Sequence, residues 1–416
     1  NYCFYAGFLI KRVNKASSFY RGIRFYFVQF LSCKDKSPYF MRGLTFVFFL
    51  LIAVHSFSQR KVTQLIEQSA TSLESGAHLS FLSSDEMRGR DTGSPELDIA
   101  AKYISTQLKI FGVKPVKGDT SYFQEVRLEK IAPATSASMT LGEEVFNLKD
   151  DLLYISGKSA ALEGDMVFVG YGSAADFEKV DVKDKIVVAL AGSNATTNAV
   201  QALLTDAPEK GRRAAAHGAA AMIEIMLLPG LPWQALVNFL SQDRMVTLKD
   251  GSKPIPHFFM RKTESAGVTA LMETKSAKGK LKVEATATKP VPAKNVVGMI
   301  EGKDAALKNE WIVISAHYDH VGVKKNATAD SIYNGARDNA IGTVALLQAA
   351  KFFGKNPPKR SVLFLAVTAE EKGRLGSEWY SNHPLIALKQ TVFNLNCDGT
   401  GYNHKTSVTM IDLNRT

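Results

Sequence analysis

Three apolar stretches of the sequence are each followed by side chains that can bind a metal ion or transfer a proton. His317 and Asp319 follow the first stretch. Glu370 and Glu371 follow the second, and Asp398 follows the third. One imidazole and several carboxylates make up a ligand set that zinc accepts, and a carboxylate that is not a ligand can act as a general base. These residue types therefore indicate metal-assisted hydrolysis.

Each of these residues also has an ordinary structural explanation. Asp338 could cap a helix that begins at Gly342, and Asp398 precedes a glycine as a turn residue would. Paired acids such as Glu370 and Glu371 are common in solvated loops. The metal interpretation rests on their joint occurrence, because all of them follow strand ends or precede a helix start on what we expect to be one sheet edge.

The adjacent acids Glu370 and Glu371 suit a division of roles. Consecutive side chains point in different directions, so one carboxylate can bind metal while the other faces the substrate. A histidine ligand also needs a partner for its second ring nitrogen, and we assign that role to Asp319, which is close to His317 in sequence. Two zinc ions about 3.5–4 Å apart need a bridging carboxylate, and a water between them becomes a nucleophile near neutral pH.

Alternating strands and helices are expected to position these residues. Near-continuous apolar strands that alternate with helices are typical of an α/β sheet covered on both faces. In such sheets ligands bind outside the carboxyl ends of the strands, where the polar residues above occur. The predicted elements are strand 311–316, helix 342–353, strand 362–368, a short helix from about 376 and strand 392–396.

Composition shifts divide the rest of the chain. An amphipathic helix starts at Pro95, capped by Ser94, and ends at Gly112. Short apolar runs separated by turn residues then extend to the Lys-Pro-Val-Pro seam at 289–292. We therefore predict an upstream extension at 1–40, a signal peptide at 41–58, an N-terminal part of the catalytic domain at 59–133, an insert at 134–290 and the catalytic core at 291–416.

The segment 41–58 has the features of a signal peptide. A basic residue precedes the apolar run 44–54, and the Ser-Phe-Ser tripeptide at 56–58 offers a cleavage pattern. The run is short for a membrane span, so a stable membrane anchor is the weaker interpretation. We expect an exported protein, periplasmic or extracellular. Residues 1–40 are interpreted as an artefactual extension, with a disordered leader as the alternative.

The net charge of +11 does not point to nucleic acid as a partner. Residues 1–40 hold seven Lys/Arg and one acid, so much of the excess lies upstream of the predicted mature chain. No basic run alternates with aromatic residues in the way that nucleic-acid binding requires. Of the 3 cysteines only Cys397 follows the leader, which excludes a disulfide framework in the mature chain. The oligomeric state is not indicated.

Several short motifs carry a resemblance to a known family. They are Asn295-Val296-Val297-Gly298, Ser315 to His320, Gly335 to Gly342, Thr368 to Gly373 and Asn394 to Asp398. Together they resemble family 28 of the metallopeptidases (clan MH), which includes bacterial dizinc aminopeptidases and has glutamate carboxypeptidase as a relative. The stretch 82–94 is also similar to these enzymes, and the insert, through 167–172 and 210–225, resembles a protease-associated (PA) domain. One departure is Ile341, where the family more often has Ser.

The resemblance implies a fold class and a role for each site residue. The fold is a mixed, largely parallel sheet sandwiched by helices, of the phosphorylase/hydrolase-like kind, with an inserted β-rich PA-like domain. Two Zn²⁺ ions are implied. The resemblance assigns one of them to His317, Asp338 and Asp398. The other is assigned to Asp338, Glu371 and a further histidine, with Glu370 as general acid/base.

Two positions remain open in this assignment. Asn396 could occupy the ligand position in place of Asp398, which is preferred because an anion is needed there. The family's last ligand is a histidine well downstream of the third motif, whereas this chain ends at Thr416. His404 lies in a polar turn and is not expected to be that ligand. We therefore expect a C-terminally incomplete catalytic domain whose second zinc site lacks its histidine.

The remaining histidines are expected to have lesser roles. His320 and His383 are interpreted as surface residues or as partners behind the ligands. His217 and His257 lie in the predicted insert, where we expect structural roles.

The predicted function is that of an exported zinc-dependent exopeptidase of the aminopeptidase type, acting on a peptide or oligopeptide. Glu370 would deprotonate a metal-bridging water that attacks the peptide carbonyl, and the proton would pass to the leaving amine. The alternatives are a carboxypeptidase or dipeptidase of the same family, a glutaminyl cyclase-like acyltransferase with a single metal, and a non-catalytic receptor-like homologue. Such receptors lose ligands and base, whereas both are present here.

Overall fold

The computed structural model describes residues 63–116, 118, 120–196, 198–247, 254–262, 264–324 and 328–400. The chain divides into two compact units, Asn1–Ser69 and Ala70–Thr416, and the second unit holds the elements described below. The predicted extension at 1–40, the predicted signal peptide at 41–58 and His404 lie outside the described residues. Within the described part of the chain, no helix has the length and apolar character needed to cross a bilayer.

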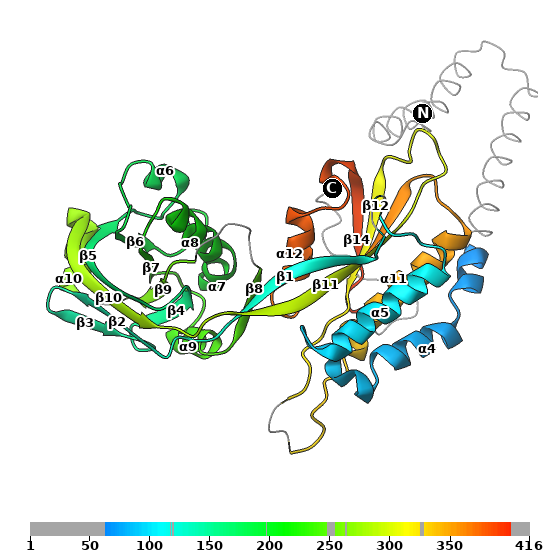
Figure 1. The fold of residues 1–416 in the computed structure, drawn as a ribbon, viewed down its shortest axis with the longest axis horizontal. Helices are drawn as coiled ribbons and strands as arrows, with labels where there is room; N and C mark the ends of the chain where they lie inside the picture. Colours follow the sequence, from blue (N-terminus) through cyan, green and yellow to red (C-terminus); the bar gives the residue numbers. More distant parts are fainter. Residues whose placement is uncertain are drawn as a thin grey trace, which may run out of the picture. The chain divides into compact units, whose positions relative to one another are not determined.

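A six-stranded mixed sheet carries the predicted site residues (Figure 1). In order across the sheet, its strands are β14 (Thr391–Asn396), β12 (Trp311–His317), β13 (Ser361–Val367), β11 (Lys289–Ile300), β1 (Phe123–Ile131) and β8 (Arg244–Thr247). β12 pairs in parallel with β13 and with β14. β11, β1 and β8 pair antiparallel with their neighbours, so the parallel part is narrower than predicted.

The apolar residues of β12 and β13 account for the place of these strands inside the sheet. Every residue of β13 is buried, as are all but one of β12. Strands that are buried on both faces fit only where both faces of the sheet are covered. Their side chains alternate as a strand requires: Ile314 and Phe364 face one core, whereas Val313 and Leu365 face another.

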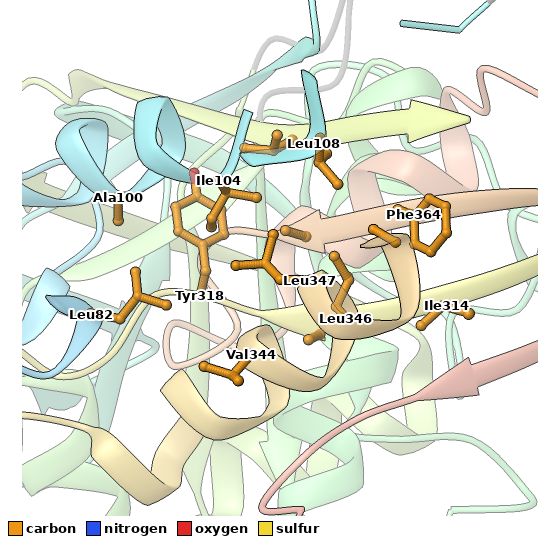
Figure 2. Packing of buried hydrophobic residues seen from close by; sticks show 14 of the residues in the cluster. Leu82, Ala100, Ile104, Leu108, Ile314, Tyr318, Val344, Leu346, Leu347 and Phe364 are labelled. Carbon is orange, nitrogen blue, oxygen red and sulfur yellow. The ribbon is translucent and has the colours of Figure 1, made fainter. Parts of the chain in front are cut away.

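Three helices cover the first of these faces: α4 (Ser72–Leu82), α5 (Pro95–Ile110) and α11 (Ile341–Lys355) (Figure 1). The side chain of Ser94 accepts a hydrogen bond from the amide of Leu97, which confirms the predicted start of α5. Figure 2 shows side chains from all three helices packed with those of the sheet. Among them are Leu82, Ala100, Ile104, Leu108, Val344 and Leu347, which meet Ile314 and Phe364.

The opposite face is covered by α12 (Leu375–Asn382). Its Trp379 packs in one cluster with Leu128 of β1, and its Tyr380 packs in another with Leu363 of β13. Helices therefore lie on both faces of a mixed sheet, and the predicted α/β fold class is confirmed. The helix and strand predictions that bracket the site agree with the structure to within two residues at each end.

A second mixed sheet has eight strands. In order, they are β3 (Glu144–Asn147), β2 (Ser136–Leu141), β10 (Ser276–Glu284), β5 (Ala160–Phe168), β6 (Ile186–Leu190), β7 (Ala221–Met226), β9 (His257–Arg261) and β4 (Leu152–Ser156). The helices between them are α6 (Ala174–Phe177), α7 (Ala199–Gln201), α8 (Ala207–Ala216), α9 (Trp233–Leu240) and α10 (Ala266–Thr274). β5, β6, β7 and β9 are parallel neighbours and short helices alternate with them, so this β-rich region also has α/β character.

The seam predicted at 289–292 is part of a β-ribbon. β11 pairs antiparallel with β1 from Phe123↔Val296 to Lys130↔Lys289. β8 also pairs with β1, although its residues fall inside the segment predicted as an insert. The short strand escaped prediction because four residues of intermediate burial leave no clear period.

Candidate metal centre

The predicted site residues lie at the carboxyl ends of three parallel strands. His317 is the last residue of β12, and its register partner in β13 is Val367. Glu370 and Glu371 follow β13 after a short turn, and Asp398 follows β14. Because parallel strands end at the same edge, the three segments meet there.

The segment before α11 brings Asp338 to the same edge. Its neighbour Asn339 is fully buried, and its side-chain oxygen accepts hydrogen bonds from the amides of Gly342 (3.1 Å) and Gly399 (3.1 Å). The side-chain amide of Asn339 donates to the carbonyl of Cys397 at 2.9 Å. Asn339 therefore ties the start of α11 to the segment after β14. The interpretation of Asp338 as a helix cap is wrong, because Asn339 takes that role.

His317, Asp338 and Asp398 form the first cluster of possible metal ligands. His317 Nε2 lies 3.2 Å from Asp338 Oδ1 and 3.6 Å from Asp398 Oδ1. Two donors that bind one tetrahedral zinc at about 2.0–2.1 Å stand about 3.3 Å apart, so these spacings suit a shared ion. The imidazole is buried, whereas the two carboxylates are more than half exposed at 59% and 51%.

The surroundings of His317 strongly favour positive charge at this position. Burial alone would lower the pKa of the imidazole, but the carboxylates of Asp319, Glu370 and Asp398 outweigh it and raise the pKa to about 9. The same carboxylates would attract a metal dication that takes the place of the proton on His317.

The structure places Asp319 beside His317 and gives it further contacts. Its carboxylate oxygen lies 3.8 Å from His317 Nδ1, beyond hydrogen-bond distance, while its main-chain carbonyl lies 3.2 Å from that nitrogen. The fully buried carboxylate instead accepts hydrogen bonds from the amides of Glu370 (3.1 Å) and Glu371 (3.2 Å). Asp319 thus holds the segment with the two acids against the end of β12, and both its carboxylate and its main-chain carbonyl lie on the Nδ1 side of the imidazole.

His320, Asp338 and Glu371 form a second cluster of possible ligands. His320 Nδ1 lies 2.6 Å from Glu371 Oε1, which is a hydrogen bond and shorter than the spacing of two ligands on one zinc. His320 is therefore placed best as a partner that orients the Glu371 carboxylate. Asp338 belongs to both clusters, as the residue assigned to bridge two ions must.

Glu370 lies beside both clusters without belonging to either. Ala369, with φ of 54°, turns the chain sharply after β13 and separates the directions of the two acids that follow. Glu370 is half-buried, and burial raises its pKa. His317 opposes this shift, and the carboxylates of Asp319, Glu371 and Asp398 add to it. A carboxylate with a raised pKa next to metal ligands has the properties of a general base.

The choice between Asn396 and Asp398 can be compared with the geometry. Asn396 Oδ1 accepts a hydrogen bond from Ser315 Oγ at 2.9 Å, so its side chain is engaged between β14 and β12. Asp398, by contrast, faces His317 in the first cluster. The geometry favours Asp398.

The donor set fits metal dications. Five carboxylates gather here, and each of them interacts electrostatically with His317 or with the buried guanidinium of Arg90. They belong to Asp319, Asp338, Glu370, Glu371 and Asp398. Like charges at such spacing repel one another, and a bound cation relieves the repulsion. Imidazole and carboxylate are ligands that zinc accepts.

Comparison with known families supports the resemblance seen in the motifs. Residues 295–415 match the model of peptidase family M28. This range begins in β11 and includes every predicted ligand and the predicted base.

Curated relatives match this chain over a short length. A vacuolar membrane protease of Saccharomyces cerevisiae (strain YJM789) is 34% identical over 107 residues, which is 26% of this chain and 10% of that protein. A vacuolar membrane protease of Coccidioides posadasii (strain C735) is 31% identical over 122 residues, which is 26% of this chain and 11% of that protein. The chain thus matches about a tenth of the length of these relatives.

Solved structures resemble the chain over a longer range at lower identity. An aminopeptidase from Aneurinibacillus sp. strain AM-1 is 22% identical, with 80% of this chain and 71% of that chain covered and a TM-score of 0.48. A zinc aminopeptidase from Bacillus subtilis is also 22% identical, with 79% of this chain and 69% of that chain covered and a TM-score of 0.33.

Proposed function

From the premise that residues 295–415 form a peptidase family M28 segment, we propose that the chain is a zinc-dependent exopeptidase of the aminopeptidase type. The observation that carries the proposal is a pair of ligand clusters that share Asp338 and lie beside Glu370. His317, Asp338 and Asp398 would hold one Zn²⁺. Asp338 and Glu371 would hold a second, with His320 behind Glu371.

The proposed chemistry divides between the ions and the chain. Bound zinc would polarise the peptide carbonyl and make water more acidic near neutral pH. Glu370 would take a proton from the attacking water and deliver it to the leaving amine. Its raised pKa suits both steps, because a carboxyl group that titrates nearer to neutral pH can accept and return a proton.

The two clusters also bear on the alternatives. A single-metal acyltransferase of the glutaminyl cyclase kind needs one cluster, whereas two ligand clusters are present among the described residues. A receptor-like homologue needs neither a base nor ligands, and this chain has both in one place. The amino end of the peptide is proposed as the point of attack, with a carboxypeptidase or dipeptidase activity as the outcome that would correct it.

Two further parts of the proposal concern the rest of the chain. We propose that segment 41–58 directs export, since its composition is that of a signal peptide. We also propose that residues 134–290, which contain all strands of the eight-stranded sheet, are a PA-like insert between two parts of the peptidase domain, 59–133 and 291–416.

Hydrolysis of a matched set of small substrates tests the proposed activity. The set comprises amino-acid anilides, the same anilides with an acetylated amine, carboxyl-terminal dipeptides and peptides with N-terminal glutamine. We expect zinc-dependent release of the aniline from the free-amine anilides and none from the acetylated ones, and loss of that release with a chelator. Cyclisation of N-terminal glutamine, or cleavage that is indifferent to acetylation, would contradict the aminopeptidase assignment.

A further inference from the structure

Arg90 is the largest side chain that is fully buried among the described residues. It ends the short 3₁₀ turn Asp85–Arg90, between α4 and α5, and its φ of 48° is rare for a residue with a side chain. A buried arginine must place its five N–H donors on acceptors, so its partners show what it holds together.

The guanidinium donates to main-chain carbonyls of three separate segments. Nε donates to Tyr318 at 2.9 Å, and Nη2 donates to Gly335 at 2.9 Å. Nη1 donates to Asn334 at 2.8 Å and also to Leu82, at the end of α4. All of these acceptors are carbonyls, so the rigid fork of the guanidinium fixes the main chains themselves.

Two of these carbonyls belong to the segments that carry the proposed ligands. Tyr318 lies between His317 and Asp319, and Gly335 lies just before Asp338. A single planar group therefore sets the spacing of the segments that present His317 and Asp338. That spacing decides whether the two side chains, now 3.2 Å apart, can share an ion.

The main chain next to Arg90 strengthens the same connection. The carbonyl of Arg90 accepts a hydrogen bond from the amide of His320 at 3.1 Å, and that of Gly89 accepts one from Gly322 at 3.0 Å. A Cβ at Gly335 would come within 2.7 Å of Arg90 Nη2, so the loop follows the guanidinium closely.

The charge of Arg90 also suits this place. Burial lowers its pKa to about 10, while the carboxylates of Asp319, Asp338 and Glu371 oppose that shift. The guanidinium remains charged at neutral pH and offsets part of the repulsion among these acids.

We propose that Arg90 is a positioning residue for the metal centre, which it serves by clamping the segments of His317 and Asp338 at the ligand spacing. The proposal rests on the proposed function, because it requires that the site bind zinc. It predicts that loss of the fork weakens zinc binding even in a protein that remains folded.

Zinc affinity of Arg90 variants, measured by competition with a chromophoric chelator on the full chain, tests the clamp. Arg90→Met removes fork and charge, and Arg90→Lys retains the charge without the fork. We expect Arg90→Met to weaken zinc binding about 10–100-fold, as for other residues that support ligands. For Arg90→Lys, the change in the logarithm of the zinc dissociation constant should be at least half of that seen for Arg90→Met. Methylguanidine added to Arg90→Met should restore part of the affinity.

Arg244 provides a matched control. Its guanidinium also donates to main-chain carbonyls, those of Tyr154 and Ile155 in the eight-stranded sheet. Arg244→Met should lower the melting temperature and leave zinc affinity unchanged. Wild-type affinity in folded Arg90→Met would overturn the clamp while leaving the proposed function intact. If Arg90→Met does not fold, wild-type zinc affinity in folded Arg90→Lys would overturn the clamp in its place. A wild-type chain that binds no zinc would overturn both proposals.

Discussion

Two clusters of acidic and imidazole side chains in this molecule differ in whether they contain a partner for their own charge. One is the proposed metal centre at the edge of the six-stranded sheet. The other lies in the eight-stranded sheet, where Glu224 of β7 is fully buried between Lys210 of α8 and His257 of β9. Both contain carboxylate and imidazole, and the second also contains a lysine in direct contact with its acid.

The cluster around Glu224 contains hydrogen-bond partners for its own buried charges. Lys210 Nζ donates to Glu224 and to the carbonyls of Leu190 (2.6 Å) and Gly192 (3.0 Å), and His257 Nε2 lies 2.8 Å from Glu224 Oε1. Burial would raise the pKa of Glu224, but His257 and Lys210 outweigh it and hold the pKa below its ordinary value. His257 thus has the structural role predicted for it.

The proposed metal centre differs from this cluster in the partners of its acids. Its acids face imidazoles and one another, and the pKa of Glu370 is raised where that of Glu224 is lowered. Arg90 contributes charge, but its guanidinium donates its hydrogen bonds to the main-chain carbonyls described above rather than to the acids. The comparison teaches that a buried acid with its own lysine is a structural device, whereas a group of acids around imidazoles is prepared for an external cation.

The largest expected effect is on turnover, from Glu370→Gln. General acid/base catalysis contributes about 10²–10⁴-fold, so we expect a loss of that size in kcat with zinc content unchanged. Glu371→Gln is the neighbouring control, and it should lose zinc together with activity. Hydrolysis rates and zinc per chain should be measured on the same samples. Substantial turnover by Glu370→Gln would exclude Glu370 as the base.

The next effect concerns stability in the cluster around Glu224. Lys210→Met removes the lysine partner of the buried Glu224 carboxylate, and removing one member of a buried ion pair costs about 3–5 kcal/mol. Zinc affinity should not change. Urea unfolding of zinc-free protein gives the free energy of unfolding.

An exposed pair in the same sheet serves as its control. Lys280 and Glu163 lie 2.8 Å apart with side chains 61% and 71% exposed, so Lys280→Met should cost at most about 1 kcal/mol. Equal losses for the Lys210 and Lys280 variants would remove the distinction between a cluster that contains a partner for its charge and one that does not.

A smaller effect is expected from His320→Asn. The shorter side chain cannot keep the 2.6 Å hydrogen bond to Glu371, so the ion held by Asp338 and Glu371 should bind about 10-fold more weakly. His383, which stacks on Trp379, provides the control, and His383→Asn should bind zinc as the wild type does. If both variants bind zinc equally well, His320 does not support Glu371.

The sequence was informative where local pattern and topology agree. Apolar strands followed by polar residues predicted which side chains meet at the sheet edge, since parallel strands share that edge. The same pattern could not show that Asp319 would hold the Glu370 and Glu371 amides, because this depends on how two segments pack.

Other features depended on contacts between distant parts of the chain. Arg90 and its acceptors Tyr318 and Gly335 are 228 and 245 positions apart, and nothing in the local sequence marks that pairing. His320 follows a ligand motif as a surface histidine would, and only the fold brings it to Glu371. The strand β8 has no clear period in its sequence, and only its pairing with β1 shows that it is a strand.

The central claim is that one aspartate serves two ions, and zinc per chain measured by elemental analysis tests it most directly. We expect one tightly held zinc ion per wild-type chain and a second, looser one at Asp338 and Glu371. Asp398→Asn should lose the tight ion, and Asp338→Asn should hold neither tightly, because Asp338 belongs to both ligand clusters. Circular dichroism should show that both variants are folded. Wild-type zinc content in Asp338→Asn would contradict the account.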